Sequence, residues 1–152
     1  MIQRIKHGCV RVDGICKGTC KEGLCILLGV ACGDTEADAE RLSHKILQLR
    51  IFSDEVGKMN RSVMDIGGEV LLVSNFTLLG SYKKGNRPDY MNAASPAEAE
   101  RLYQYFGSLC EKELKHVGYG VFGAHMEIDL SCDGPVTMTL DSRILQPSAQ
   151  NK

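Results

Sequence analysis

Two short segments hold the side chains and backbone groups that are best placed to do chemistry. Residues 73–78 (Val-Ser-Asn-Phe-Thr-Leu) and 132–137 (Cys-Asp-Gly-Pro-Val-Thr) each place small hydroxyls, glycine or proline at the end of an apolar, β-branched run. Backbone groups at such strand ends escape pairing in a sheet and can meet a ligand. No histidine, metal-ligand cluster or nucleotide-binding glycine loop accompanies the two segments. We therefore expect chemistry that is carried largely by the backbone.

Ser74 and Thr77 are the candidate nucleophiles of the first segment. A nucleophilic hydroxyl needs a base, normally a histidine that a carboxylate orients. The four histidines show no spacing that indicates such a system, although triad partners can be remote in sequence, and the Gly-x-Ser-x-Gly elbow is absent. Residue types alone favour the structural alternative, in which these hydroxyls satisfy backbone groups at a strand end.

The segment 133–135 and the loop 80–90 each allow two interpretations. Asp-Gly-Pro is typical of a turn between strands; with a cis Gly-Pro bond, neighbouring carbonyls could instead point together and accept hydrogen bonds from an ammonium group. Residue types favour the turn. The loop carries Lys83, Lys84 and Arg87 between two tyrosines. This pattern fits a phosphate-binding patch with a ring for base stacking as well as it fits a solvated loop.

Composition limits the class of protein. The 152 residues, 43% of them hydrophobic and 24% charged, are ordinary for one globular domain. A net charge of −1 gives no long-range attraction for nucleic acid. No apolar run is long enough for a signal peptide or a membrane span, so we expect a cytoplasmic protein without a membrane partner. The seven cysteines are irregularly spaced without a Cys-x-x-Cys pair, so we expect no metal and no cofactor.

The first half of the chain predicts a hairpin, a buried strand and a helix. Asp13-Gly14 between alternating residues is a strong hairpin signal. The apolar run 24–30 indicates a strand that is covered on both faces. Thr35 and Asp38 have the spacing of a capping box, and apolar residues follow at helical spacing to residue 49. We expect short strands at 50–52 and 62–66.

The second half predicts further strands around one long helix. Residues 69–78 are the most β-prone segment. Ser95 followed by proline starts a helix that Gly118 can end, and glycine-rich 118–124 suits a ligand-facing loop or a connector. Strands are expected at 126–131 and 136–140, and residues 143–152 are interpreted as a tail after a domain of residues 1–142. The fold class is α+β: a mostly antiparallel sheet or partial barrel packed with two amphipathic helices.

These segments together resemble the D-aminoacyl-tRNA deacylase family from about Met1 to Ser142. The family motif Ser-Gln-Phe-Thr-Leu matches residues 74–78 except that Asn75 replaces glutamine. The motif Asn-x-Gly-Pro-Val-Thr matches residues 132–137 except that Cys132 replaces asparagine. Shorter blocks agree at residues 50–52, 57–60, 87–88, 92–94 and 122–124.

The resemblance implies a homodimer that hydrolyses the ester between a D-amino acid and the 3′-terminal adenosine of tRNA. It also implies action on glycine misattached to the tRNA for alanine. In the family the Gly-Pro bond is cis, and each subunit inserts it into the partner's active site. By this analogy, the Gly134 and Pro135 carbonyls hold the α-ammonium group and leave no room for an L side chain. Rigid backbone of this kind rejects a mirror image whatever its side chain.

The same resemblance assigns roles to individual residues. Ser74, Asn75 and Phe76 bind the adenosine and the ester, with the Phe76 backbone N–H as oxyanion donor. The substrate site further includes Ala93, Phe122 and Met126. The charge pattern of the loop, rather than the resemblance, leads us to expect that Lys83, Lys84 and Arg87 contact the tRNA. We favour attack by water, with the ribose 2′-hydroxyl of the RNA assisting. A Thr77-dependent acyl-enzyme and a non-catalytic module that binds the end of tRNA are the alternatives.

Overall fold

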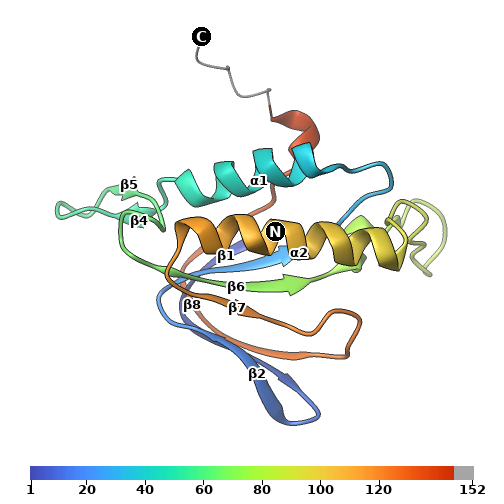
Figure 1. Cartoon of the computed structure of the whole chain (residues 1–152), viewed down its shortest axis with the longest axis horizontal. Coiled ribbons are helices and arrows are strands. Elements are labelled where there is room, and N and C mark those ends of the chain that lie inside the picture. Colours follow the sequence, from blue (N-terminus) through green and yellow to red (C-terminus); the bar gives the residue numbers. More distant parts are fainter. Residues whose placement is uncertain (146–152) are drawn as a thin grey trace.

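A curved mixed sheet, covered on one face by two helices, forms the body of the molecule in the computed structural model, which describes residues 1–145 (Figure 1). The strands are β1 (Ile2–Val12), β2 (Ile15–Cys20), β3 (Gly23–Leu28), β4 (Phe52–Ser53), β5 (Met59–Arg61), β6 (Glu69–Ser74), β7 (Val117–Tyr119) and β8 (Glu127–Met138). The helices are α1 (Glu36–Gln48) and α2 (Pro96–Glu113), with 3₁₀ turns η1 (Phe76–Leu79) and η2 (Ser142–Ile144). None of the helices in this part of the chain is long and apolar enough to cross a membrane.

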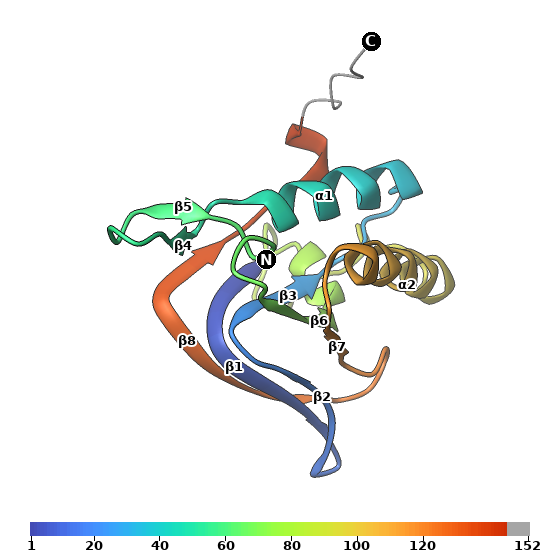
Figure 2. The same ribbon diagram turned by 60° about the vertical axis from the view of Figure 1, so that its left-hand side comes forward.

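The sheet has the order β2-β1-β3-β6-β7, with β8 paired to β1. The pairings of β1 with β2, β3 and β8 are antiparallel, whereas β3–β6 and β6–β7 are parallel. Parallel neighbours need a crossover, and α1 and α2 lie in the two crossovers. β1, β2 and β8 curl away from the helices and give the sheet the shape of a partial barrel (Figure 2). The predicted α+β class with two helices is confirmed.

Apolar side chains pack on both faces of the sheet. Between sheet and helices, Phe106 of α2 is 1% exposed and packs with side chains of β3, β6 and α1. Inside the curl, Ile5 and Val10 of β1 meet Leu71 and Val73 of β6. Strand β6 therefore contributes to both cores, which explains its unbroken apolar run and fixes its carboxyl end in space.

Three local predictions are confirmed. Asp13 and Gly14 have φ of +50° and +75° in the turn between β1 and β2. The Thr35 amide donates to the Asp38 carboxylate at 2.9 Å, as a capping box requires. Ser95 Oγ accepts from the Glu98 amide at 3.4 Å, and proline occupies the first turn of α2.

Other local predictions are wrong. Of the strand expected at residues 50–52, only Phe52 lies in a strand, and the β-prone run 69–78 leaves the sheet after Ser74. Residues 62–66 form a turn, because the Ser62 amide and hydroxyl both donate to the Asp65 carboxylate, at 2.7 and 2.9 Å. Helix α2 ends at Glu113, and Gly118 lies within β7, where a Cβ would collide with the Thr19 carbonyl oxygen. Of the predicted tail, 143–144 belong to η2 and 146–152 lie outside the described residues.

Candidate active site

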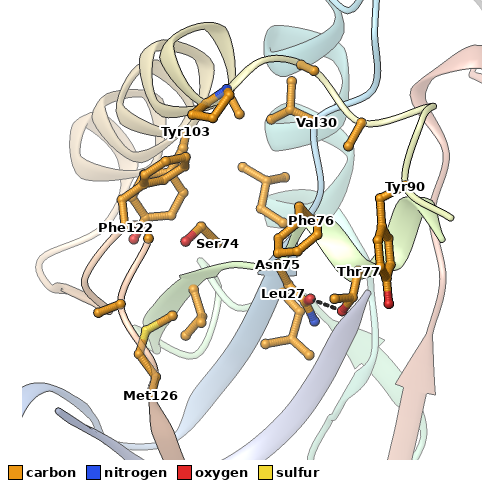
Figure 3. A pocket seen from close by; sticks show the side chains of 18 of the residues that line it. Leu27, Val30, Ser74, Asn75, Phe76, Thr77, Tyr90, Tyr103, Phe122 and Met126 are labelled. Atoms are coloured by element: carbon orange, nitrogen blue, oxygen red, sulfur yellow. Dashed lines mark hydrogen bonds between the residues drawn. The ribbon is translucent and has the colours of Figure 1, made fainter. Parts of the chain in front are cut away.

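A cavity of about 780 Å³ opens where the carboxyl ends of β3 and β6 meet the first half of α2 and the loop after β7 (Figure 3). β3 and β6 are parallel neighbours that end together, with Leu28 paired to Ser74. In sheets with parallel strands, ligands bind outside the carboxyl ends of the strands. The walls are mostly apolar, with the polar groups of residues 74–77 along one side.

Ser74 is the last residue of β6 and half-buried, and the chain then leaves the sheet into η1. Thr77 Oγ1 donates to Asn75 Oδ1 at 2.5 Å, so that two side chains of the first segment form one unit (Figure 3). The Phe76 ring is 58% exposed and meets the Tyr90 ring edge-on, with centroids 5.0 Å apart. Within residues 1–145 the Phe76 amide has no hydrogen-bond acceptor. It is therefore available to a ligand.

The opposite wall of the cavity is aromatic. The Tyr103 ring of α2 lies 5.8 Å from that of Phe122, centroid to centroid (Figure 3). The Tyr103 hydroxyl donates to the Leu72 carbonyl oxygen of β6 at 2.9 Å, and burial raises its pKa to about 12. This hydroxyl thus keeps its proton at neutral pH and ties α2 to β6. The wall presents flat apolar surface of the kind that accepts a planar ring.

The second candidate segment lies in a bulge of β8. The register advances two residues along β1, from Gln3 to Ile5, but five along β8, from Thr137 to Cys132. Residues 133–136 therefore bulge out of the pairing, where the sequence predicted a turn between two strands. The Gly134–Pro135 peptide bond is cis, and φ of Gly134 is +123°. Both residues are exposed, and neither lines the cavity of its own chain.

The side chain of Arg4 in β1 contacts the chain at this bulge. Its Nε donates to the Asp133 carbonyl oxygen at 3.3 Å and lies 3.1 Å from the Asp133 carboxylate. Its Nη1 donates to the Ile51 carbonyl oxygen at 2.6 Å. One largely buried guanidinium thus connects the bulge to the segment before β4, and a planar fork of donors suits this bridging role.

The family model described as D-Tyr-tRNA(Tyr) deacylase matches residues 1–141. The chain belongs to this family. The D-aminoacyl-tRNA deacylase of Caldicellulosiruptor bescii is 51% identical over 143 residues, which cover 94% of this chain and 96% of the relative. As a member of the D-Tyr-tRNA(Tyr) deacylase family, the chain is a hydrolase of aminoacyl-tRNA esters.

Two solved structures share the fold of this deacylase family. A structure titled c-Myc DNA Unwinding Element Binding Protein has a TM-score of 0.87 at 39% identity, covering 92% of this chain and 95% of the other. A structure titled as a probable eukaryotic D-amino acid tRNA deacylase has a TM-score of 0.77 at 14% identity, covering 88% of this chain and 93% of the other. The second likeness concerns the fold alone.

Most residues that the sequence singled out for the deacylase site lie around the one cavity: Ser74, Asn75, Phe76, Thr77, Ala93, Phe122 and Met126. Gly134 and Pro135 lie away from it on β8. Lys83, Lys84 and Arg87 are exposed on the loop between η1 and α2, and none lines the cavity. The roles of all these residues in the deacylase remain predictions.

Sequence reasoning missed part of the cavity lining. Tyr90, Tyr103 and His125 line it, together with the end of β3. Tyr103 follows Ala99 by one helical turn on the apolar face of α2, and it both packs in the core and lines the cavity. His125 is the only histidine along the cavity within residues 1–145; its signal was its place between the Phe-Gly-Ala block and Met126. The same part of the chain contains no group of three or more potential metal-ligating side chains.

Proposed function

We propose that this chain hydrolyses the ester bond of D-aminoacyl-tRNA, and of glycine misattached to the tRNA for alanine, and releases free amino acid and tRNA. The observation that carries the proposal is the junction of β6 and η1. There residues 74–77 of the first family motif line one wall of an apolar cavity that is open to a large substrate. The match to the deacylase family over residues 1–141 supports it.

The cavity offers a place for the 3′-terminal adenosine. The aromatic wall of Tyr103 and Phe122 can take the flat base, and the polar side at residues 74–77 is then left for the ribose and the ester. Asn75 is one methylene shorter than the glutamine of the family motif, and its Oδ1 accepts from Thr77. We therefore assign hydrogen bonding to the substrate to the Asn75 amino group.

Hydrolysis in this proposal is attack by water, assisted by the ribose 2′-hydroxyl of the tRNA. The Phe76 amide, which has no acceptor among residues 1–145, is the oxyanion donor, a contribution worth about 3 kcal/mol. The Thr77 hydroxyl donates its proton to an amide oxygen, which is not a base, and no hydrogen bond joins it to a histidine within residues 1–145. Thr77 therefore holds Asn75 in place and does not attack the ester.

Selection against L-amino acids is assigned to the backbone of the β8 bulge. Gly134 and Pro135 are exposed and lie outside the cavity of their own chain, so they would reach a substrate only in a second subunit. We propose a homodimer in which each bulge enters the partner's cavity and its carbonyls hold the α-ammonium group. A D side chain then points away from the carbonyls and an L side chain collides with them. We place this enzyme in the cytoplasm, where charged tRNA is used.

The test compares D-tyrosyl-, L-tyrosyl- and glycyl-tRNA with the purified protein. We expect fast release of D-tyrosine and glycine and at least 100-fold slower release of L-tyrosine. Comparable rates for both tyrosine enantiomers would contradict the proposal that the backbone of the β8 bulge rejects L-amino acids. Tight tRNA binding without release of either D-tyrosine or glycine would favour the non-catalytic module.

Replacing Thr77 separates attack by water from an acyl-enzyme. We expect Thr77→Val to lower kcat for D-tyrosyl-tRNA by only about 10-fold, because the variant loses the orienting bond to Asn75 but not the oxyanion donor. Thr77→Ser, which keeps the hydroxyl, is the matched control and should stay near the parent rate. Loss of all activity in Thr77→Val, with an acyl adduct trapped on the parent, would establish Thr77 as nucleophile.

The basic loop is expected to contribute electrostatic affinity for tRNA. The double variant Lys83→Ala/Lys84→Ala should weaken binding several-fold and reduce the slope of log K against log salt by about 1–2, because each phosphate contact releases about one counterion. The matched control is Lys112→Ala/Lys115→Ala, in the last turn of α2 and just after it, and neither residue lines the cavity. Equal slopes for parent and loop variant across a salt series would remove these lysines from the RNA surface.

A further inference from the structure

Two cysteines lie side by side on the outer face of the β1–β2 hairpin. Cys9 Sγ and Cys16 Sγ are 2.8 Å apart, so no other atom separates the two thiols. Cys16 is exposed and Cys9 is half-buried. Neither residue lines the cavity, and the proposed function makes no use of them.

The strand register explains why these thiols meet. Side chains alternate along β1, so that Gly8 and Val10 are buried whereas Cys9 and Arg11 face outward. Cys16 of β2 pairs with Arg11, which places it on the same outer face as Cys9. The register between β1 and β2 shifts between Val10 and Arg11, as at a β-bulge. A bulge increases the local twist, which brings the diagonal pair together.

The other cysteines differ from this pair. Cys20, Cys25 and Cys110 are buried, and burial raises the pKa of each thiol to about 12, which makes them unreactive. Cys32 and Cys132 are exposed, but within residues 1–145 neither has a second thiol within hydrogen-bonding distance. The Cys9–Cys16 contact is thus the one place in the described chain where two accessible sulfurs are close enough to join.

We propose that Cys9 and Cys16 form a redox modification site, in which a hydroperoxide converts the two thiols to a disulfide. The exposed Cys16 sulfur attacks the peroxide, the O–O bond breaks, and Cys16 becomes a sulfenic acid as an alcohol or water leaves. The Cys9 sulfur then attacks the Cys16 sulfur, an S–S bond forms and water is released. The two thiols together supply the two electrons that reduce the peroxide.

The chain favours closure over further oxidation of Cys16. The resolving sulfur is already in contact, so the second step needs only a small shift of two side chains. The hydrogen bond with Cys16 raises the pKa of Cys9, which leaves the more exposed Cys16 as the first target. The disulfide would join two neighbouring strands that already pair, so no distant segments have to be brought together. This proposal does not depend on the deacylase function.

Trypsin gives a direct test, because it cleaves after Arg11 and separates the two cysteines. The reduced full chain is treated with one equivalent of hydrogen peroxide, alkylated and digested without reductant. We expect a linked pair of peptides, residues 7–11 joined to residues 12–17, that separates on reduction. Intact mass should fall by the two hydrogens lost, and the midpoint of thermal unfolding should rise by about 5–10 °C, as closure of a short loop predicts.

Two variants serve as controls. Cys32→Ser, which removes an exposed thiol elsewhere, should leave the linked pair unchanged, and Cys9→Ser should abolish it and leave oxidised Cys16. The proposal is wrong if the parent shows Cys16 as sulfinic acid with Cys9 alkylated. It is equally wrong if Cys16 is joined to Cys20 or to a second molecule in place of Cys9.

Discussion

Replacing Gly134 by alanine is expected to lower kcat/KM for D-tyrosyl-tRNA at least 100-fold while the protein stays folded. Gly134 has φ of +123°, a conformation that costs an L residue about 1–3 kcal/mol. A Cβ there would stand 2.8 Å from the Val136 amide nitrogen and 3.3 Å from Arg4 Nη2. The bulge must therefore shift, and a displacement of about 1 Å at a reacting group can cost about 100-fold in rate.

The control for this variant is Gly14→Ala in the hairpin turn. Gly14 also has positive φ, +75°, but a Cβ there would meet no atom within 4 Å. It introduces comparable backbone strain far from the β8 bulge, so its kcat/KM should equal that of the parent. Rates for D- and L-tyrosyl-tRNA are measured on both variants, with thermal unfolding as the check on folding. Parent activity and parent chiral selectivity in Gly134→Ala would remove the bulge from the mechanism.

The sequence predicted the elements better than it predicted their partners. Hairpin, caps and amphipathic faces are local signals, and Asp13-Gly14, Thr35 with Asp38, and Ser95 behave as those signals indicate. The parallel pairing of β3 with β6 joins segments more than 40 residues apart, and no local pattern reveals which strands become neighbours. The inner wall of the cavity follows from that pairing, so no local pattern showed that the buried Tyr103 also lines a cavity.

The β8 segment shows a second limit of sequence reasoning. Asp-Gly-Pro is a turn signal, yet β1 is long enough to pair with residues on both sides of it. A turn would end the pairing with β1, whereas a bulge preserves pairing before and after the interruption and thus retains more hydrogen bonds. Arg4 stabilises the bulge, because its guanidinium contacts the carbonyl and the carboxylate of Asp133. The two residues are 129 positions apart in the sequence, and no periodic pattern in the sequence indicates that they are in contact.

Arg4→Met is therefore expected to damage both stability and catalysis. The Arg4 side chain is 11% exposed and that of Asp133 is 28% exposed, so the variant leaves a carboxylate in a partly buried place without its main partner. We expect a loss of about 2–3 kcal/mol in the free energy of unfolding, measured with urea. Because the bulge also loses its tether to Ile51, kcat/KM for D-tyrosyl-tRNA should fall about as far as in Gly134→Ala.

Lys6→Met is the matched control, since Lys6 Nζ also lies near the Asp133 carboxylate, at 3.6 Å, but its side chain is 54% exposed. An exposed pair of this kind contributes little because solvent screens it, so stability and activity should change little. If Arg4 affects catalysis only through the bulge, the double variant Arg4→Met/Gly134→Ala should be no less active than either single variant. If the losses in kcat/KM of Arg4→Met and Gly134→Ala are fully additive, Arg4 does not act through the bulge. Its role is then support of the fold, and the bulge keeps its geometry without Arg4.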